Sequence, residues 1–156
     1  MSWTILDLDW RPPLWEDPAA YPGLMAEAAP LADVVIGSDA EFAAAGLAPE
    51  GPVEPGRLVV LKHGDGGVTL LSAAGLRSVP GIAVDVVCGL GAGDALTAAF
   101  AAGLVRGLDP LASVERGNAA GAIVASRLTC SSAMPTPAEI DRLLTRHATG
   151  PQEVRP

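Results

Sequence analysis

A glycine-rich turn that ends in an aspartate is the part of this sequence best suited to chemistry. Residues 89–94 read Gly-Leu-Gly-Ala-Gly-Asp and join an apolar segment to a long alanine-rich stretch. Closely spaced glycines allow a tight turn that directs free backbone N–H groups to one point, and the following helix N-terminus adds partial positive charge there. The turn therefore predicts an anion-binding site with Asp94 beside it.

Asp94 has two interpretations. A carboxylate next to a bound phosphate is unfavourable for binding alone because the two negative charges repel each other. It suits catalysis if a hydroxyl lying between them gives its proton to Asp94 while the turn stabilises a transferring phosphoryl group. An ordinary helix start after a glycine loop fits the same residues, so both interpretations stay open.

Two other phosphate-binding motifs are excluded by the residues themselves. The P-loop pattern G-x-x-x-x-G-K-[ST] needs a lysine after its second glycine, but the one lysine of this chain is Lys62. The dinucleotide pattern G-x-G-x-x-G fails because, counted from Gly89, Asp94 stands where the third glycine belongs.

Composition narrows the possible partners. The net charge is −8 and hydrophobic residues make up 49% of the chain, so we expect a folded protein that binds neither DNA nor RNA. Cys88 and Cys130 form no C-x-x-C pair, which argues against a zinc site and a disulfide scaffold. No apolar run is long enough to span a membrane, so we expect no membrane partner and a cytoplasmic location.

The elements that must position these residues alternate between strands and helices, which predicts an α/β fold. Apolar runs predict strands at 4–8, 33–36, 57–62, 68–72 and 76–79, and a further extended piece at 82–87. Residues 63–67 predict a hairpin turn. Helices are expected at 17–29 with an interruption at Pro22, from Ser38 to Gly46, from Gly91 to Leu108, at 110–128 and at 138–147.

Gly91-Ala-Gly-Asp94, placed after an extended segment and at the start of an alanine-rich helix, resembles the C-terminal signature of the ribokinase-like (PfkB) carbohydrate kinases. The resemblance implies that the backbone of Gly91, Ala92 and Gly93 forms the anion hole and that Asp94 is the catalytic base. It also implies a ribokinase-like three-layer fold with a mostly parallel sheet, flanking helices and an antiparallel hairpin.

Other stretches resemble the nucleotide site of this family. The segment from Lys62 to Gly67, with Gly64 between them, is similar to a K-x-G-x-x-G turn near the nucleotide phosphates, and Asn118 resembles a residue beside the adenine. Glu41 corresponds to a metal-site glutamate, although Ser38 stands where the family has asparagine. A surface lysine at a strand end and a hydrogen-bonded core amide remain the alternatives for Lys62 and Asn118.

Within the family, residues 6–12, 118–127 and 130–136 are most similar to 5-dehydro-2-deoxygluconokinase of inositol breakdown. In related kinases of sugar acids, an arginine after a strand meets the substrate carboxylate. Arg11 matches that arginine, and Asp9 stands where those kinases have asparagine. A guanidinium suits the task because its planar fork binds a carboxylate at two points. Packing of Arg11 on Trp15 is the alternative.

The resemblance implies ATP and Mg²⁺ as cofactors, a monovalent cation as an optional third ligand, and a sugar or sugar acid as acceptor. We expect 1–148 to be the C-terminal, nucleotide-binding half of such a kinase and 149–156 to be a disordered tail. Two functions follow: a sugar kinase whose other half comes from elsewhere, or an inactive remnant that binds nucleotide or mediates association. Edge pairing of the strand at 4–8 would favour homo-oligomers.

Overall fold

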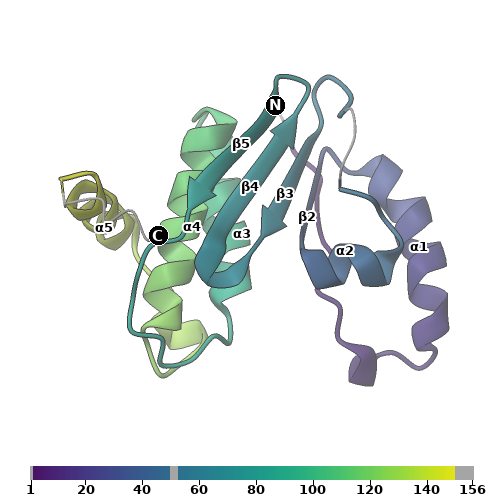
Figure 1. The fold of residues 1–156 in the computed structure, drawn as a ribbon, viewed down its shortest axis with the longest axis horizontal. Coiled ribbons are helices and arrows are strands. Elements are labelled where there is room, and N and C mark those ends of the chain that lie inside the picture. The colour runs from purple at the N-terminus through teal and green to yellow at the C-terminus, as the bar shows by residue number, and fades with distance from the viewer. Residues whose placement is uncertain (1, 50–52, 150–156) are drawn as a thin grey trace.

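The computed structural model describes residues 2–49 and 53–149, and its centre is one five-stranded sheet (Figure 1). The strands are β1 (Ile5–Asp7), β2 (Val34–Ser38), β3 (Leu58–Lys62), β4 (Gly67–Ser72) and β5 (Gly75–Pro80), side by side in that order. β1, β2 and β3 pair in parallel, whereas β4 is antiparallel to both of its neighbours. All strands except β4 therefore point the same way, with the predicted antiparallel hairpin at β3–β4.

Helices cover both faces of the sheet, which confirms the three-layer prediction (Figure 1). One face packs against α3 (Ala92–Val105) and α4 (Pro110–Ala125), and the other against α1 (Tyr21–Ala28) and α2 (Asp39–Ala45). α5 (Pro137–Thr149) lies outside α4. Short 3₁₀ turns occupy Pro12–Leu14, Pro18–Ala20, Ala29–Leu31, Gly64–Gly66 and Ser131–Ala133.

Alternation along the strands divides the core into two clusters, because successive side chains of a strand point to opposite faces. Strand residues that face α3 and α4 include Val34, Ile36, Val60, Val68 and Leu70. Those that face α1 and α2 include Val35, Leu61 and Leu71. Full burial of each such side chain stabilises the fold by ~1.5–3 kcal/mol.

The helix between Ser38 and Gly46 is confirmed, and its ends are fixed by local chemistry. The Ser38 hydroxyl accepts the Glu41 N–H, and the Glu41 carboxylate accepts the Ser38 N–H at 2.6 Å, which is a capping box. Gly46 ends α2 in the left-handed conformation, with φ 66°. This cap fixes Glu41 at the end of β2.

The first helix differs from its prediction. Pro22 does not interrupt it, because α1 begins at Tyr21 and Pro22 falls in the first turn, where a backbone N–H has no helical acceptor to lose. Residues 18–20 form a separate 3₁₀ turn, and the Asp17 carboxylate accepts the Ala19 N–H there. The strand expected at 4–8 is also shorter, since β1 covers only Ile5–Asp7.

The extended piece expected at 82–87 is not a strand. β5 ends at Pro80, which has no N–H to continue a ladder, and the N–H groups of Val87 and Cys88 both donate to the carbonyl of Ala125 instead. Residues 81–91 thus return along the end of α4 to the start of α3. α4 itself ends at Ala125 rather than at 128.

Two further expectations concern the ends of the chain and the membrane. α5 extends from Pro137 to Thr149, slightly beyond the predicted 138–147, and the remainder of the expected tail lies outside the described residues. Among the helices of 2–49 and 53–149, none combines the length and the hydropathy that a membrane crossing needs.

Candidate active site

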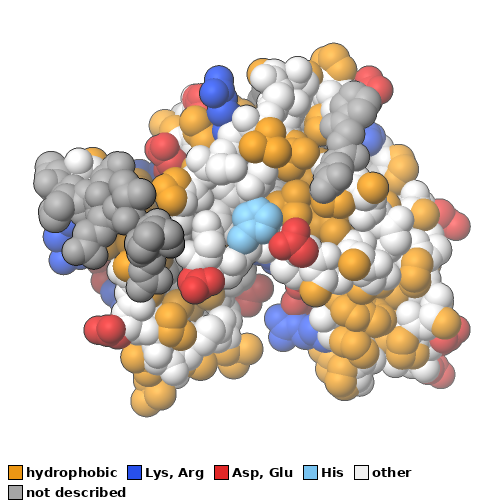
Figure 2. Space-filling view, viewed as in Figure 1, with side chains coloured by type: hydrophobic (Ala, Val, Ile, Leu, Met, Phe, Trp, Pro, Cys, Tyr) orange, Lys and Arg blue, Asp and Glu red, His pale blue; other side chains and the backbone are white. Residues whose placement is uncertain are grey.

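The candidate residues gather at one edge of the sheet. β1, β2, β3 and β5 all end at this edge because they run in the same direction. In open α/β sheets, ligands bind outside the carboxyl ends of the strands. The surface has a notch at the lower edge of the view in Figure 2, between the two groups of helices, and acidic and basic side chains lie along it.

The glycine turn forms the N-terminus of α3, as expected. Gly91 has φ 84°, a left-handed conformation that glycine adopts at little cost, and immediately precedes the helix. The first helical hydrogen bond runs from the Ala95 N–H to the Gly91 carbonyl at 2.9 Å. The N–H groups of Gly93 and Asp94 belong to the first turn, for which the helix supplies no acceptor. Such a turn can hold an anion.

Asp94 is the third residue of α3, and its side chain is exposed to solvent. Its carboxylate lies near enough to Arg11 to contribute to the raised pKa of that guanidinium. The hydrogen bond to Asp9 is the main cause of the rise, and Glu41 contributes as well. The carboxylates of Asp94 and Glu41 therefore lie close enough to the Arg11 guanidinium to favour its charged form.

Lys62, the last residue of β3, lies between two carboxylates. Its Nζ is 3.1 Å from Oδ1 of Asp7 and 3.3 Å from Oε2 of Glu41, and its side chain is only 15% exposed. The ammonium also lies under the first turn of α3, because a Cβ added at Gly93 would be 3.5 Å from Nζ. This lysine is therefore not a surface side chain.

Arg11 and Asp9 follow β1. Nε of Arg11 donates to Oδ1 of Asp9 at 2.7 Å, and both side chains are about half exposed. Asp9 has a φ of 34°, which is uncommon for a residue other than glycine. The ring of Trp15 packs against the rings of Trp10 and Tyr21. The Tyr21 hydroxyl donates to the Leu8 carbonyl, so these aromatic side chains hold the loop after β1 in place.

The remaining predicted residues also lie at this end of the sheet. Gly64 and Gly67 shape the β3–β4 turn, with φ 61° and 98°. Asn118 in α4 is buried, and its Nδ2 donates to the carbonyl of Pro80, the last residue of β5, at 2.9 Å. That bond is what the core-amide interpretation of Asn118 requires.

Asp7 and Thr97 were not among the predicted residues. Oδ2 of Asp7 accepts the Thr97 hydroxyl at 2.6 Å, while Oδ1 contacts Lys62. The sequence does contain a signal for each. Asp7 places a charge at the end of an apolar strand, and Thr97 lies three residues after Asp94, on the same side of the helix.

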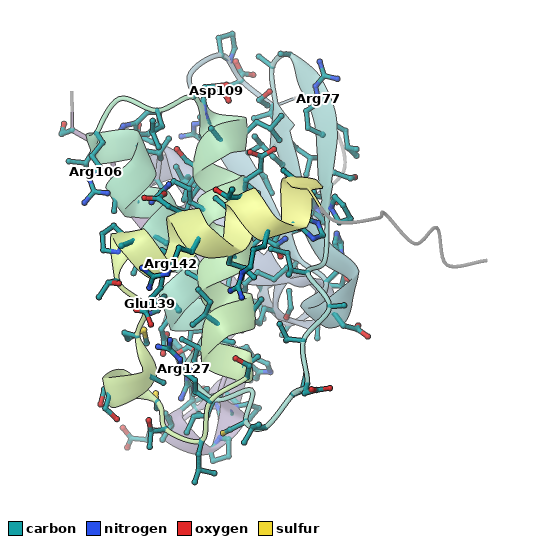
Figure 3. All side chains as sticks on the ribbon, turned by 90° about the vertical axis from the view of Figure 1, so that its left-hand side faces the viewer. Arg77, Arg106, Asp109, Arg127, Glu139 and Arg142 are labelled. Carbon is teal, nitrogen blue, oxygen red and sulfur yellow. The ribbon has the colours of Figure 1, made fainter. Side chains whose placement is uncertain are left out.

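A cavity of about 590 Å³ lies away from this edge of the sheet. It is lined by residues 82–84, by the end of α4 and by α5, including Arg127, Glu139 and Arg142 (Figure 3). None of the predicted site residues lines it. We place the candidate chemistry at α3 because Asp94, the first-turn amides and the ion-paired Lys62 lie together there.

Comparison with known proteins identifies the family. The model for pfkB family carbohydrate kinases matches residues 3–137, from just before β1 to the start of α5. The chain belongs to this family. Within it, the chain is 36% identical over 153 residues to 5-dehydro-2-deoxygluconokinase of Bacillus licheniformis, and 34% identical over 161 residues to that of Geobacillus kaustophilus.

These relatives are much longer than the chain. The two alignments cover 90% and 94% of this pfkB-family chain but only 46% and 47% of the relatives. The chain therefore spans less than half the length of these kinases.

Solved structures of the family have the same fold. A fructokinase double mutant from Vibrio cholerae, bound to fructose, ADP and potassium ion, matches with a TM-score of 0.79 and 24% identity, over 91% of this chain and 50% of that one. Aminoimidazole riboside kinase from Salmonella enterica, complexed with aminoimidazole riboside and an ATP analogue, matches with a TM-score of 0.75 and 23% identity. This match covers 90% of this chain and 52% of that one. The ribokinase-like fold is thus established for this chain.

Proposed function

We propose that this chain carries the nucleotide-binding and catalytic part of an ATP-dependent kinase that phosphorylates a hydroxyl of a sugar or sugar acid. The observation that supports this most strongly is that the Asp94 carboxylate belongs to the first turn of α3. The backbone N–H groups of Gly93 and Asp94 in the same turn have no acceptor within the helix. A base and an anion-binding site then face the same small volume.

In the proposed reaction, the acceptor hydroxyl gives its proton to the carboxylate of Asp94. Its oxygen forms a bond to the γ-phosphorus while the bond from that phosphorus to the bridging oxygen of ADP breaks. Negative charge on the transferring group is stabilised by the backbone of Gly91, Ala92 and Gly93 at the N-terminus of α3. ADP leaves, and the proton on Asp94 passes to solvent.

The residues around this turn fit ATP and Mg²⁺. Lys62 offers a cation beside the first turn of α3, and Glu41 offers a carboxylate at the end of β2. Mg²⁺ is commonly held by one or two carboxylates together with phosphate oxygens and water. When bound, Mg²⁺ neutralises charge on the phosphates; in this proposal Glu41 holds it, and Lys62, Gly64, Gly67 and Asn118 line the nucleotide site.

We propose 5-dehydro-2-deoxygluconate as the acceptor. The support is the 36% identity to a kinase named for this substrate, together with the position of Arg11. Arg11 lies after β1, half exposed, with Asp94 contributing to its raised pKa. A guanidinium there can receive the carboxylate of a sugar acid, with Asp9 holding its Nε in place.

A second candidate is a chain that binds nucleotide or associates with other chains without transferring phosphate. The observation in its favour is the position of β1 at the edge of the described sheet, where its three residues are half-buried. Strand pairing at this edge would support a homo-oligomer or a contact with another chain.

A complementation assay separates the two candidates. The chain is assayed alone and fused behind the N-terminal half of the Bacillus licheniformis kinase, with Mg-ATP and either 5-dehydro-2-deoxygluconate or fructose, and the phosphorylated sugar is detected by mass spectrometry. We expect the fusion to phosphorylate the sugar acid and the chain alone to give no detectable turnover, since positioning contributes ~7–11 kcal/mol to such reactions. A folded fusion that binds Mg-ATP but phosphorylates no sugar would favour the second candidate.

A further inference from the structure

We propose that Asp7 is a positioning residue that fixes the N-terminus of α3, and with it Asp94 and the glycine turn, against the end of the sheet. The functional part of this inference rests on the proposed kinase activity; the positioning itself does not. Asp7 uses both carboxylate oxygens, Oδ1 toward Lys62 at 3.1 Å and Oδ2 toward the Thr97 hydroxyl at 2.6 Å. It joins residues that are 55 and 90 positions away along the chain.

The composition of α3 explains why such a bond matters. Asp94 and Thr97 are the two polar side chains of this helix, whose remaining residues are alanine, glycine, leucine, phenylalanine and valine. Apolar packing holds the helix on the sheet and against α4, where Gly117 approaches Leu96 closely, but this packing is not directional. A hydrogen bond depends on distance and angle. The Thr97–Asp7 bond therefore adds a directional contact between α3 and the end of β1.

Position along the helix links this bond to the chemistry. Thr97 lies three residues, or about one turn, after Asp94, and so on the same side of α3. A shift of Thr97 would move Asp94 and the first-turn N–H groups with it. Misplacement of reacting groups by about 1 Å can cost ~10²-fold in rate.

Charge gives Asp7 a second task. Lys62 places an ammonium under the helix N-terminus, where the partial positive charge of the helix disfavours a cation. Asp7 and Glu41 offset this cost from two sides, at 3.1 and 3.3 Å. Glu41 is held in turn by the Ser38 N–H, so the ammonium has one carboxylate from β1 and one from α2. Asp7 thus holds both the Lys62 ammonium and, through Thr97, the helix α3 at the end of β1.

Amide hydrogen exchange measured by NMR on the whole chain tests the positioning. Thr97→Val keeps the shape of the side chain but removes the hydroxyl, Thr97→Ser keeps the hydroxyl, and Asp7→Ala removes the acceptor. We expect Thr97→Val and Asp7→Ala to speed exchange at residues 95–98 by about fivefold, the effect of losing one net hydrogen bond. Thr97→Ser should leave these rates near those of the wild type.

α1, on the opposite face of the sheet from α3, provides the reference, because its amides can exchange by a local opening that leaves the Thr97–Asp7 bond intact. Exchange in α1 should change little in all three variants, whereas β2 and β3, which exchange on unfolding of the whole protein, should speed up by no more than the same fivefold. The double variant Asp7→Ala with Thr97→Val should be no faster at 95–98 than Asp7→Ala alone, since the Thr97 bond is already lost there. Unchanged exchange at 95–98, or an equal increase in α1, overturns the proposal. If Thr97→Val does not fold, Asp7→Ala gives the same test.

A second arm separates this inference from the proposed function. Addition of Mg²⁺ and the non-hydrolysable nucleotide AMP-PNP should slow exchange at 95–98 in the wild type, and less so in Thr97→Val. If the mutations act as expected but AMP-PNP has no effect on the wild type, the positioning stands and the kinase proposal fails. If AMP-PNP protects the turn equally in the wild type and in Thr97→Val, Asp7 does not position the nucleotide site.

Discussion

Gly91 and Cys130 lie in direct contact, although they are far apart in the chain. A Cβ added at Gly91 would lie 2.6 Å from Sγ of Cys130, closer than real side-chain contacts allow. The loop after α4 thus packs against the turn that begins α3. Gly91 is required here both for its φ of 84° and for its lack of a side chain.

Gly91→Ala should therefore destabilise the fold more than its backbone conformation alone explains. The left-handed conformation costs alanine ~1–2 kcal/mol, and overpacking adds ~1–3 kcal/mol. Gly107→Ala is the matched control, since Gly107 has φ 79° and open space around its Cα. Urea unfolding measures both. Adding Cys130→Ala should recover the overpacking part in Gly91→Ala; equal destabilisation at 91 and 107 would show that the contact has no energetic effect.

Arg11→Lys tests substrate recognition in the fused enzyme. Lysine keeps the charge but loses the two-point contact, so KM for 5-dehydro-2-deoxygluconate should rise about tenfold, as expected for one charge-assisted hydrogen bond. KM for fructose, which has no carboxylate, should change much less. Arg77→Lys on β5, an exposed arginine, controls for the change of side chain. Equal changes in KM for the two sugars would show that Arg11 supports only the loop.

Acid stability should depend on Glu139. The Thr136 backbone N–H donates to its carboxylate at 2.7 Å, and the Arg127 guanidinium and Thr136 hydroxyl donate as well, which lowers the pKa of Glu139 from 4.5 to about 2. Arg127 at the end of α4 and Glu139 at the start of α5 lie close together in Figure 3, so this contact joins the two helices.

Because the pKa of Glu139 is lower in the folded state, protonation favours unfolding. Its contribution to stability should be complete above pH 4.5 and disappear as the pH falls through about 2. Glu139→Gln should flatten that part of the pH dependence of the unfolding free energy, as measured by chemical denaturation. Glu115→Gln, which removes an exposed carboxylate of α4, should leave the slope as it is in the wild type. Parallel curves for Glu139→Gln and the wild type would contradict this.

Local features of this fold could be predicted from the sequence because each depends on residues close together in the chain. The glycine turn before Asp94 and the helix between Ser38 and Gly46 are of this kind, and both are confirmed as elements. The prediction that Pro22 interrupts the first helix was wrong, because proline can either break a helix or begin one. Which of the two occurs depends on where the helix starts.

Contacts between distant residues could not be predicted in the same way. The bond from Thr97 to Asp7 needs β1 and α3 to meet, which no local pattern specifies. The piece at 82–87 has the composition of a strand but no ladder to join, since its neighbour β5 ends at Pro80. For Asn118 the sequence left two roles open, and its bond to Pro80 was visible only in the fold.

The turnover number of Asp94→Asn in the fused enzyme tests the central claim most directly. Asparagine keeps the size of the side chain but cannot accept the proton, so kcat should fall at least ~10²-fold, the lower range for a positioned base. The affinity for Mg-AMP-PNP should change little, because the first-turn N–H groups remain. Asp85→Asn, an exposed aspartate in the segment before the turn, should keep the kcat of the parent fusion. Near-normal turnover in Asp94→Asn would contradict the assignment of Asp94 as the base.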